Sequence, residues 1–127
     1  MKMYCEVILV DHKCVNTFFS ILDCLGFHTK KTSVFRLKSC CEDKEYFFDD
    51  REEMIGNRDI NNLLIWRTEE DSIFLSWEWR EEIMELTIHF DGWDIVDSTT
   101  MASKIFSEIS TKLYRSVEGV FFKAYFE

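Results

Sequence analysis

The chain has 127 residues, of which 46% are hydrophobic, and its formal net charge is −9. This length and apolar content suit one globular domain, residues 1–127, and exclude an intrinsically disordered chain. No apolar run approaches the roughly 18 residues of a membrane-spanning helix, and scattered Lys and Arg residues disfavour nucleic acid and anionic membranes as direct ligands.

The negative charge is concentrated in the middle of the chain. Residues 39–97 hold 18 of the 24 acidic residues against five basic ones, a local net charge of −13. All four tryptophans, at positions 66, 77, 79 and 93, lie in the same stretch. A folded domain with an anionic, aromatic-rich region can attract a basic partner.

The cysteine pattern disfavours both disulfides and zinc. The five cysteines are Cys5, Cys14, Cys24, Cys40 and Cys41, an odd number without a Cys-x-x-Cys pair. This pattern favours reduced, mostly buried thiols in a cytoplasmic protein. The N-terminus lacks a small-residue cleavage site and is interpreted as a strand rather than a signal peptide. We expect no metal and no cofactor.

The first third of the chain predicts a strand, a helix and a second strand. Residues 4–10 are apolar on both faces, as in a central strand. Asp11 can cap a helix with apolar residues at three- and four-residue spacing, and Gly26 supplies a left-handed stop. Residues 33–38 alternate between apolar and basic side chains and predict a strand.

The next region is less regular. Residues 40–62 are expected to form an irregular acidic excursion, with a short strand at 45–48 and a helical turn at 49–54. Residues 63–68 predict a third strand, in which Trp66 belongs to an all-apolar run and is expected in the core.

The clearest signal is an alternating hairpin at residues 72–90. Its apolar positions, including Trp77 and Trp79, face a core, and its other positions face water. A two-residue loop at 81–82 would place Glu78 opposite Glu85, which is unfavourable for like charges. A four-residue loop at 81–84, which pairs position 80 with Glu85, is therefore preferred.

The end of the chain predicts a helix and a strand. A cap at Ser98–Thr100 opens the helix, Gly119 ends it, and residues 120–126 form the last strand. The expected fold class is therefore α+β, a two-layer sandwich of five to six mostly antiparallel strands and two amphipathic helices. The order β-α-β-β-β-β-α-β resembles that of ferredoxin-like folds, in element order alone.

No strong catalytic signature is present, and no catalytic residue is assigned. The chain lacks a Gly-rich phosphate loop and the common hydrolase motifs. His12 beside Cys14 is interpreted as a helix-start histidine next to a buried thiol. Glu78, Glu85 and His89 share the outer face of the hairpin, which is interpreted as a solvated sheet face rather than an acid–base site.

The candidate partner-binding residues are acidic loop and hairpin positions together with one tryptophan. Loops are where binding residues concentrate, and Trp93 lies in a polar setting at a strand end. The candidates are Glu69, Glu70, Asp71, Glu78, Glu81, Glu82, Glu85, Asp91, Trp93 and Asp94.

These observations favour a small acidic, non-catalytic protein that neutralises a basic protein partner. An immunity protein or antitoxin-type inhibitor of a nuclease toxin would have this size and charge, because a nuclease site that holds phosphate is positive. The alternatives are a non-catalytic interaction module or adaptor, a phage-type inhibitor that mimics DNA, and a small enzyme using Glu78, Glu85 or His89. The sequence leaves the oligomeric state open.

Overall fold

The computed structural model describes residues 1–113 and 121–127, which form seven strands and three helices. The strands are β1 (Met3–Leu9), β2 (Leu37–Cys41), β3 (Lys44–Phe48), β4 (Asn62–Trp66), β5 (Ser72–Arg80), β6 (Ile83–His89) and β7 (Phe121–Phe126). The helices are α1 (His12–Cys24), α2 (Arg51–Ile55) and α3 (Ile95–Lys112). The predicted α+β class is confirmed, but the described residues contain more strands than the expected five to six, and one more helix.

All seven strands belong to one antiparallel sheet with the order β3-β2-β4-β5-β6-β1-β7. β6 and β7 each pair antiparallel with β1, so they run in the same direction with β1 between them. The unit β6-α3-β7 is therefore a split β-α-β arrangement, and the predicted resemblance in element order has this topological basis.

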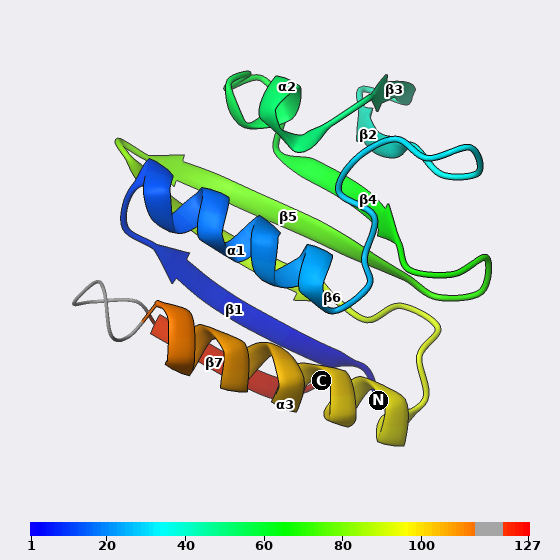
Figure 1. The fold of residues 1–127 in the computed structure, drawn as a ribbon, viewed down its shortest axis with the longest axis vertical. Coiled ribbons are helices and arrows are strands. Elements are labelled where there is room, and N and C mark those ends of the chain that lie inside the picture. The colour runs from blue at the N-terminus through cyan, green and yellow to red at the C-terminus, as the bar shows by residue number, and fades with distance from the viewer. Residues whose placement is uncertain (114–120) are drawn as a thin grey trace.

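The two long helices lie side by side on one face of the sheet (Figure 1). Alternation along each strand sends every second side chain toward them. In β1, for example, Met3, Cys5, Val7 and Leu9 are at most 5% exposed. Leu86 and Ile88 of β6 are buried on the same face. The opposite face, called the open face below, is covered by neither α1 nor α3.

The start and end of α1 follow the prediction. A carboxylate oxygen of Asp11 accepts a hydrogen bond from the backbone N–H of Cys14 at 2.7 Å, and the helix begins at the next residue, His12. Gly26 has a φ of +94°, a conformation that glycine adopts at little cost. Phe27 follows it and is 2% exposed, so the turn is closed by a buried ring.

Residues 33–36 do not form the predicted start of the second strand. The Thr32 hydroxyl accepts hydrogen bonds from the backbone N–H groups of Val34 and Phe35, at 3.2 and 2.9 Å. This turn occupies the donors that a strand would need, so β2 begins later, at Leu37.

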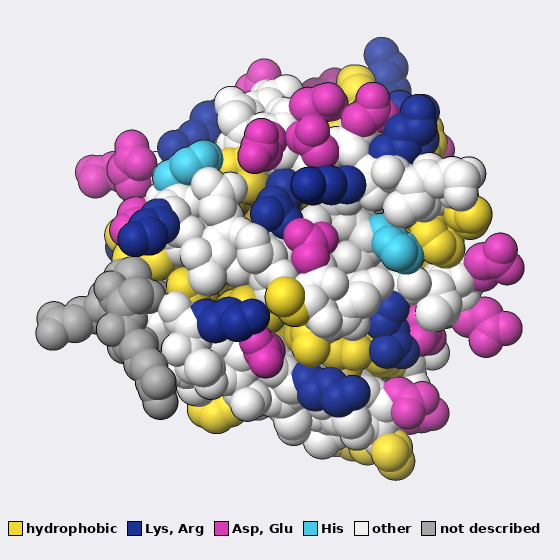
Figure 2. Space-filling view, viewed as in Figure 1, with side chains coloured by type: hydrophobic (Ala, Val, Ile, Leu, Met, Phe, Trp, Pro, Cys, Tyr) yellow, Lys and Arg dark blue, Asp and Glu magenta, His cyan; other side chains and the backbone are white. Residues whose placement is uncertain are grey.

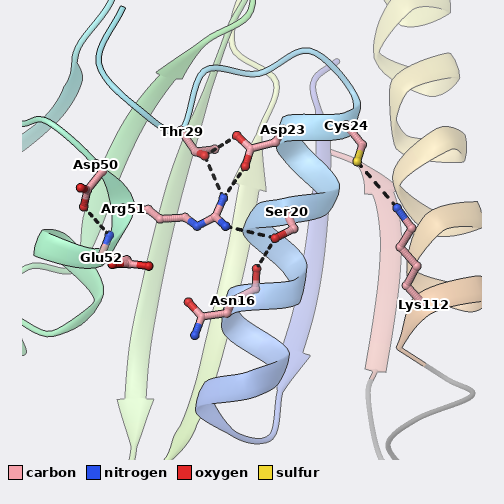
Figure 3. Close-up of polar contacts among 9 residues, drawn as sticks. All are labelled: Asn16, Ser20, Asp23, Cys24, Thr29, Asp50, Arg51, Glu52 and Lys112. Atoms are coloured by element: carbon pink, nitrogen blue, oxygen red, sulfur yellow. Dashed lines mark hydrogen bonds and ion pairs between the residues drawn. The ribbon is translucent and has the colours of Figure 1, made fainter.

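The expected irregular excursion is more ordered than predicted. It contains the β2–β3 hairpin and α2, close to the predicted short strand and helical turn. Arg51 ties α2 to α1, because its guanidinium reaches Asp23, the Thr29 hydroxyl and the Ser20 hydroxyl (Figure 3). Met54 of α2 is completely buried, which anchors this segment to the core.

The preferred four-residue loop between β5 and β6 is wrong. Glu78 lies directly opposite Glu85, and the loop is only Glu81-Glu82. Arg80 offsets the repulsion, because its guanidinium lies 2.9 Å from a Glu85 carboxylate oxygen. The shorter loop also pairs Trp79 with Met84, and the Met84 side chain is fully buried. Extra burial and a diagonal ion pair therefore outweigh one like-charge pair.

The turn itself is strained and is held from outside. Glu81 has a φ of +59°, which disfavours residues with a Cβ. The Arg58 guanidinium donates to the backbone carbonyl of Glu81 at 2.9 Å and also covers the Trp79 ring at 3.8 Å from its centroid. One side chain thus supports both the turn and the last aromatic residue of β5.

The predicted cap of the last helix is also wrong. α3 begins at Ile95, because Asp94 accepts a hydrogen bond from the backbone N–H of Asp97 at 2.7 Å. Ser98 lies one turn inside the helix, where its hydroxyl donates to the backbone carbonyl of Asp94 at 2.8 Å. The predicted stop at Gly119 lies outside the described residues.

Two tryptophans lie as predicted and one does not. Trp77 is 4% exposed on the helix-covered face, and Trp79 is half-buried on the same face. Trp66 was expected in the core but lies on the open face, opposite Ser72. Leu63 and Ile65 take the core face of β4, so the period of two sends Trp66 to the other side.

Candidate functional site

Side chains on the open face line up in rows that cross the strands. The strand registers place one large residue from each strand in a single row, here called the aromatic row. Its members, from β3 to β7, are Phe47, Lys38, Leu64, Phe74, His89, Tyr4 and Tyr125. Ring contacts join neighbours in the row, with centroids 5.4 Å apart for Phe74 and His89 and 5.2 Å for His89 and Tyr4.

The next row is made of smaller polar side chains. Asn62, Ser76, Thr87 and Glu6 lie opposite one another from β4 to β1. A further row follows on the far side, and it contains Glu78, Glu85, Ile8 and Phe121. Because the side chains of the middle row are smaller than those on either side, a hollow runs between the two flanking rows.

This hollow is the open-face groove, with a volume of about 570 Å³. Ser76 and Thr87 lie on its floor, Phe74 borders it on one side, and Glu78 and Glu85 border it on the other. The groove runs across the strands, so an occupant would contact side chains rather than the hydrogen-bonded backbone.

Three carboxylates line the groove, and two have no cationic partner. Among the described residues, no Lys or Arg nitrogen lies within 4 Å of the Glu6 or Glu78 carboxylate, whereas Glu85 pairs with Arg80. Glu6 interacts with the hydroxyl of Tyr125, and burial together with this negative charge raises the pKa of that hydroxyl. Lys123 lies directly opposite Glu6 in the β1–β7 register, beyond ion-pair distance, so Glu78 is the groove carboxylate whose facing residue is also acidic. The groove therefore presents net negative charge on a partly apolar surface.

Ser76 and His89 form a hydrogen bond at the edge of the groove. The Ser76 hydroxyl lies 3.0 Å from Nε2 of His89, and the imidazole is flanked by the Tyr4 and Phe74 rings. Burial lowers the pKa of His89, which favours the neutral ring. A serine nucleophile also needs donors for an oxyanion, and strand backbone N–H groups are used by the sheet. The pair fits a structural role.

The predicted site residues do not converge on one surface. Glu69, Glu70, Asp71, Asp91, Trp93 and Asp94 lie at the β4–β5 turn and the β6–α3 connection, at one end of β5. Glu78, Glu81, Glu82 and Glu85 lie at the other end. β5 has nine residues, so the two sets are about 25–30 Å apart. The two ends are plain in Figure 1.

Trp93 is half-buried and packs against the core of its own chain. Its indole N–H donates to the backbone carbonyl of Ser72 at 2.7 Å, and its ring lies 5.3 Å from Phe90 and 6.4 Å from Phe27. The Arg67 guanidinium lies over the same ring, at 5.4 Å from its centroid.

The acidic residues around Trp93 have partners or structural tasks. Asp71 pairs with Arg67 at 2.5 Å, and Asp91 pairs with Lys2 at 2.5 Å. Asp94 caps α3, and its charge and hydrogen bond raise the pKa of Asp97. Glu69 and Glu70 are exposed in the turn. The acidic residues at this end of β5 therefore mainly stabilise the fold and present little unpaired charge.

The face that carries α1 and α3 has mixed charge. In Figure 2, Lys and Arg side chains lie among the acidic ones across the middle of this face. Negative charge that is not matched by a neighbouring cation is therefore a better guide to a site than the number of acidic residues.

Several groove residues were not among the sequence candidates. Glu6, Asn62, Ser76 and Thr87 all line it. A usable signal existed for Glu6, which is the one charged residue inside the strand 3–9. The neutral polar residues gave none, because they become a floor only when four strands are in register.

Metal and thiol chemistry have little support. Within residues 1–113 and 121–127, no group of three His, Cys, Asp or Glu side chains could hold a metal ion. The five cysteines are free, and two of them, Cys24 and Cys40, are exposed rather than buried. Burial raises the pKa of Cys5 to about 12 and of Cys14 to about 11, so these two thiols stay protonated.

Comparison of the chain with protein-family models, with curated proteins and with solved structures found no match. No helix among the described residues has both the length and the apolar character to cross a bilayer. Functional inference therefore depends on the chemistry of the open-face groove.

Proposed function

We propose that this protein binds and neutralises a basic protein partner, in the manner of an immunity protein or antitoxin-type inhibitor of a nuclease toxin. The observation that carries the proposal is the open-face groove, in which Glu78 faces Glu85 and forms no ion pair with any residue that the structure describes. A lysine or arginine side chain of a partner would supply the missing charge. A nuclease site is rich in such side chains because it must hold phosphate.

The groove suits protein recognition better than a purely charged surface would. Ile8, Phe74 and Phe121 provide apolar area beside the carboxylates, and Phe121 is 46% exposed. Apolar contact gives binding energy, while charge directs the approach and selects the partner.

The first test is capture of the partner with the tagged protein from the source cell, with stepwise elution by salt and identification by mass spectrometry. A basic nuclease or other toxin, recovered in stoichiometric amounts and released by salt, is the expected result. A partner that stays bound at high salt would instead identify an adaptor that binds through apolar contact.

The second test measures the affinity of the captured partner for two matched variants. Glu78→Gln is expected to weaken binding about tenfold and to flatten its dependence on salt, because a charge contact is lost. Glu70→Gln removes an exposed carboxylate at the opposite end of β5 and is expected to change affinity little. Equal effects of the two substitutions would exclude the groove as the binding site.

A further inference from the structure

A second hollow lies on the open face, next to the open-face groove. It has a volume of about 390 Å³, and its lining includes Phe35, Lys38, Phe47, Leu64 and Trp66. We call it the aromatic groove. Half of its lining comes from β2, β3 and β4, and the rest comes from the segments just before β2 and just after β4. The open-face groove lies mainly over β5, β6 and β1.

The aromatic groove is built on parallel rings. The Phe35 ring stacks on Trp66 with centroids 6.1 Å apart and planes 13° apart, and it also stacks on His28 at 5.1 Å. Phe47 borders the groove and is 47% exposed. A planar ring placed here would cover aromatic surface that now faces water.

The two cations beside these rings are already paired, and the other charged residue of the lining, Glu69, is a carboxylate. Arg36 pairs with Asp49 at 3.4 Å, and Lys38 pairs with Glu45 at 3.1 Å. Neither cation is therefore available to an anionic ligand without breaking an ion pair. This argues for a neutral aromatic occupant over a phosphate-bearing one.

The two grooves are neighbours on the open face, with the Leu64–Phe74 pair of the aromatic row between them. Leu64 lines the aromatic groove, Phe74 lines the open-face groove, and these two residues are directly opposite in the β4–β5 pairing. The centres of the two grooves are separated by about three strand spacings, or about 14 Å. One short segment of a partner could reach both.

We infer that the aromatic groove is a second anchoring site, which takes an aromatic side chain of the same partner segment that places a basic side chain in the open-face groove. The inference rests on the proposed function for its basic anchor. The occupant is thus a segment with an arginine or lysine and a tryptophan, tyrosine or phenylalanine about 14 Å apart. The carboxylates of the open-face groove match the arginine or lysine, and the stacked rings of the aromatic groove match the aromatic side chain.

Three synthetic peptides test the inference. One carries two arginines, one carries a tryptophan, and the third carries both groups separated by six Gly or Ser residues, a spacer whose average reach is about 13 Å. Binding is followed by NMR shifts of the backbone amides of Lys38, Phe47, Leu64, Glu78 and Glu85. The linked peptide is expected to bind at least about tenfold more tightly than the arginine peptide.

Two matched variants show whether the aromatic groove gives the linked peptide its higher affinity. Phe47→Ser removes a ring of the aromatic groove, and Phe106→Ser removes an equally exposed ring, 48% against 47%, on α3. The advantage of the linked peptide should disappear in Phe47→Ser and persist in Phe106→Ser. Thermal unfolding of both variants confirms that they are folded at the temperature used.

The possible failures are distinguishable. If the arginine peptide shifts Glu78 and Glu85 but linking adds no affinity, the second anchor is wrong and the proposed function stands. If the arginine peptide shifts neither residue, the proposed function fails, and the two-anchor inference fails with it. Tighter binding of adenosine monophosphate than of the tryptophan peptide at the aromatic groove would also overturn the neutral occupant.

Discussion

The two ends of β5 carry similar acidic sequences but use them differently. At the end that contains Trp93, Asp71 pairs with Arg67 and Asp94 caps α3. At the other end, Glu78 faces Glu85 across the hairpin and has no cation within 4 Å among the described residues. The acidic residues at the first end stabilise the fold, whereas Glu78 at the second end forms no ion pair with any described residue.

The difference shows that acidic residues cannot be assigned a role by their number. A carboxylate that caps a helix or pairs with arginine lowers the energy of its own chain. A carboxylate held opposite another one raises it. The second kind is more informative about binding, because nothing in the protein itself explains it.

The largest expected effect is at Trp93. Trp93→Ala removes the packing on Phe27 and Phe90 and the hydrogen bond to Ser72. Because the ring is only partly buried, we expect unfolding free energy to fall by about 2–3 kcal/mol, below the range for a core aromatic. Urea denaturation measures the loss. A fully stable variant with weakened partner binding would instead restore Trp93 as a contact residue.

A smaller loss is expected when the cap of α3 is removed. Asp94→Ala leaves the backbone N–H of Asp97 without its acceptor, which should cost about 1 kcal/mol of unfolding free energy. Glu70→Ala, in the nearby turn, serves as the control and should change stability by less than about 0.5 kcal/mol. Equal losses in the two variants would contradict a capping role.

A gain in unfolding free energy, rather than a loss, is expected at the other end of β5. Glu78→Gln relieves the repulsion with Glu85, so the unfolding free energy should rise by about 0.5 kcal/mol while partner affinity falls. Denaturant midpoints measure the first effect, and the gain should shrink at high salt. A variant that loses stability would show that Glu78 already has a favourable partner within the protein.

The smallest expected effect is a dependence on pH at His89. Burial and Lys2 lower the pKa of this imidazole and Asp91 raises it, with a net lowering from 6.5. As the pH falls, His89 is protonated in the unfolded chain before it is protonated in the folded one. The neutral imidazole therefore contributes to the unfolding free energy above about pH 6.5, and this contribution is lost below it. His89→Asn should flatten the decline between about pH 7 and pH 5. The exposed His12→Asn should not.

Much of the architecture follows from local patterns. The alternation in residues 72–90 fixes which side chains face the core, and Asp11 and Gly26 mark the ends of α1. The misplaced boundaries have local causes that compete with these patterns. Thr32 uses the donors of the next residues, and Asp94 offers a cap earlier than Ser98 does.

The site was less predictable because it depends on pairing between distant strands. Glu78 and Glu85 were among the candidates, but their neighbour Glu6 comes from a strand near the start of the chain. Ser76 and Thr87 are ordinary outward-facing residues in sequence, and only the register makes them a floor. The hairpin register was mispredicted because the shorter loop keeps the Arg80–Glu85 ion pair on the diagonal and also buries Met84, and neither effect was considered from the sequence.

The place of β1 in the sheet also governs when the open-face groove can form. Cys5 of β1 pairs with Ile88 on one side and with Ala124 on the other, so both neighbours are synthesised long after β1 itself. Such distant pairings form slowly, and a nascent chain leaves β1 without its partners. Glu6 joins Glu78 and Glu85 only after β6 has emerged from the ribosome. A partial chain therefore has no complete groove, and the proposed binding site is assembled only near the end of synthesis.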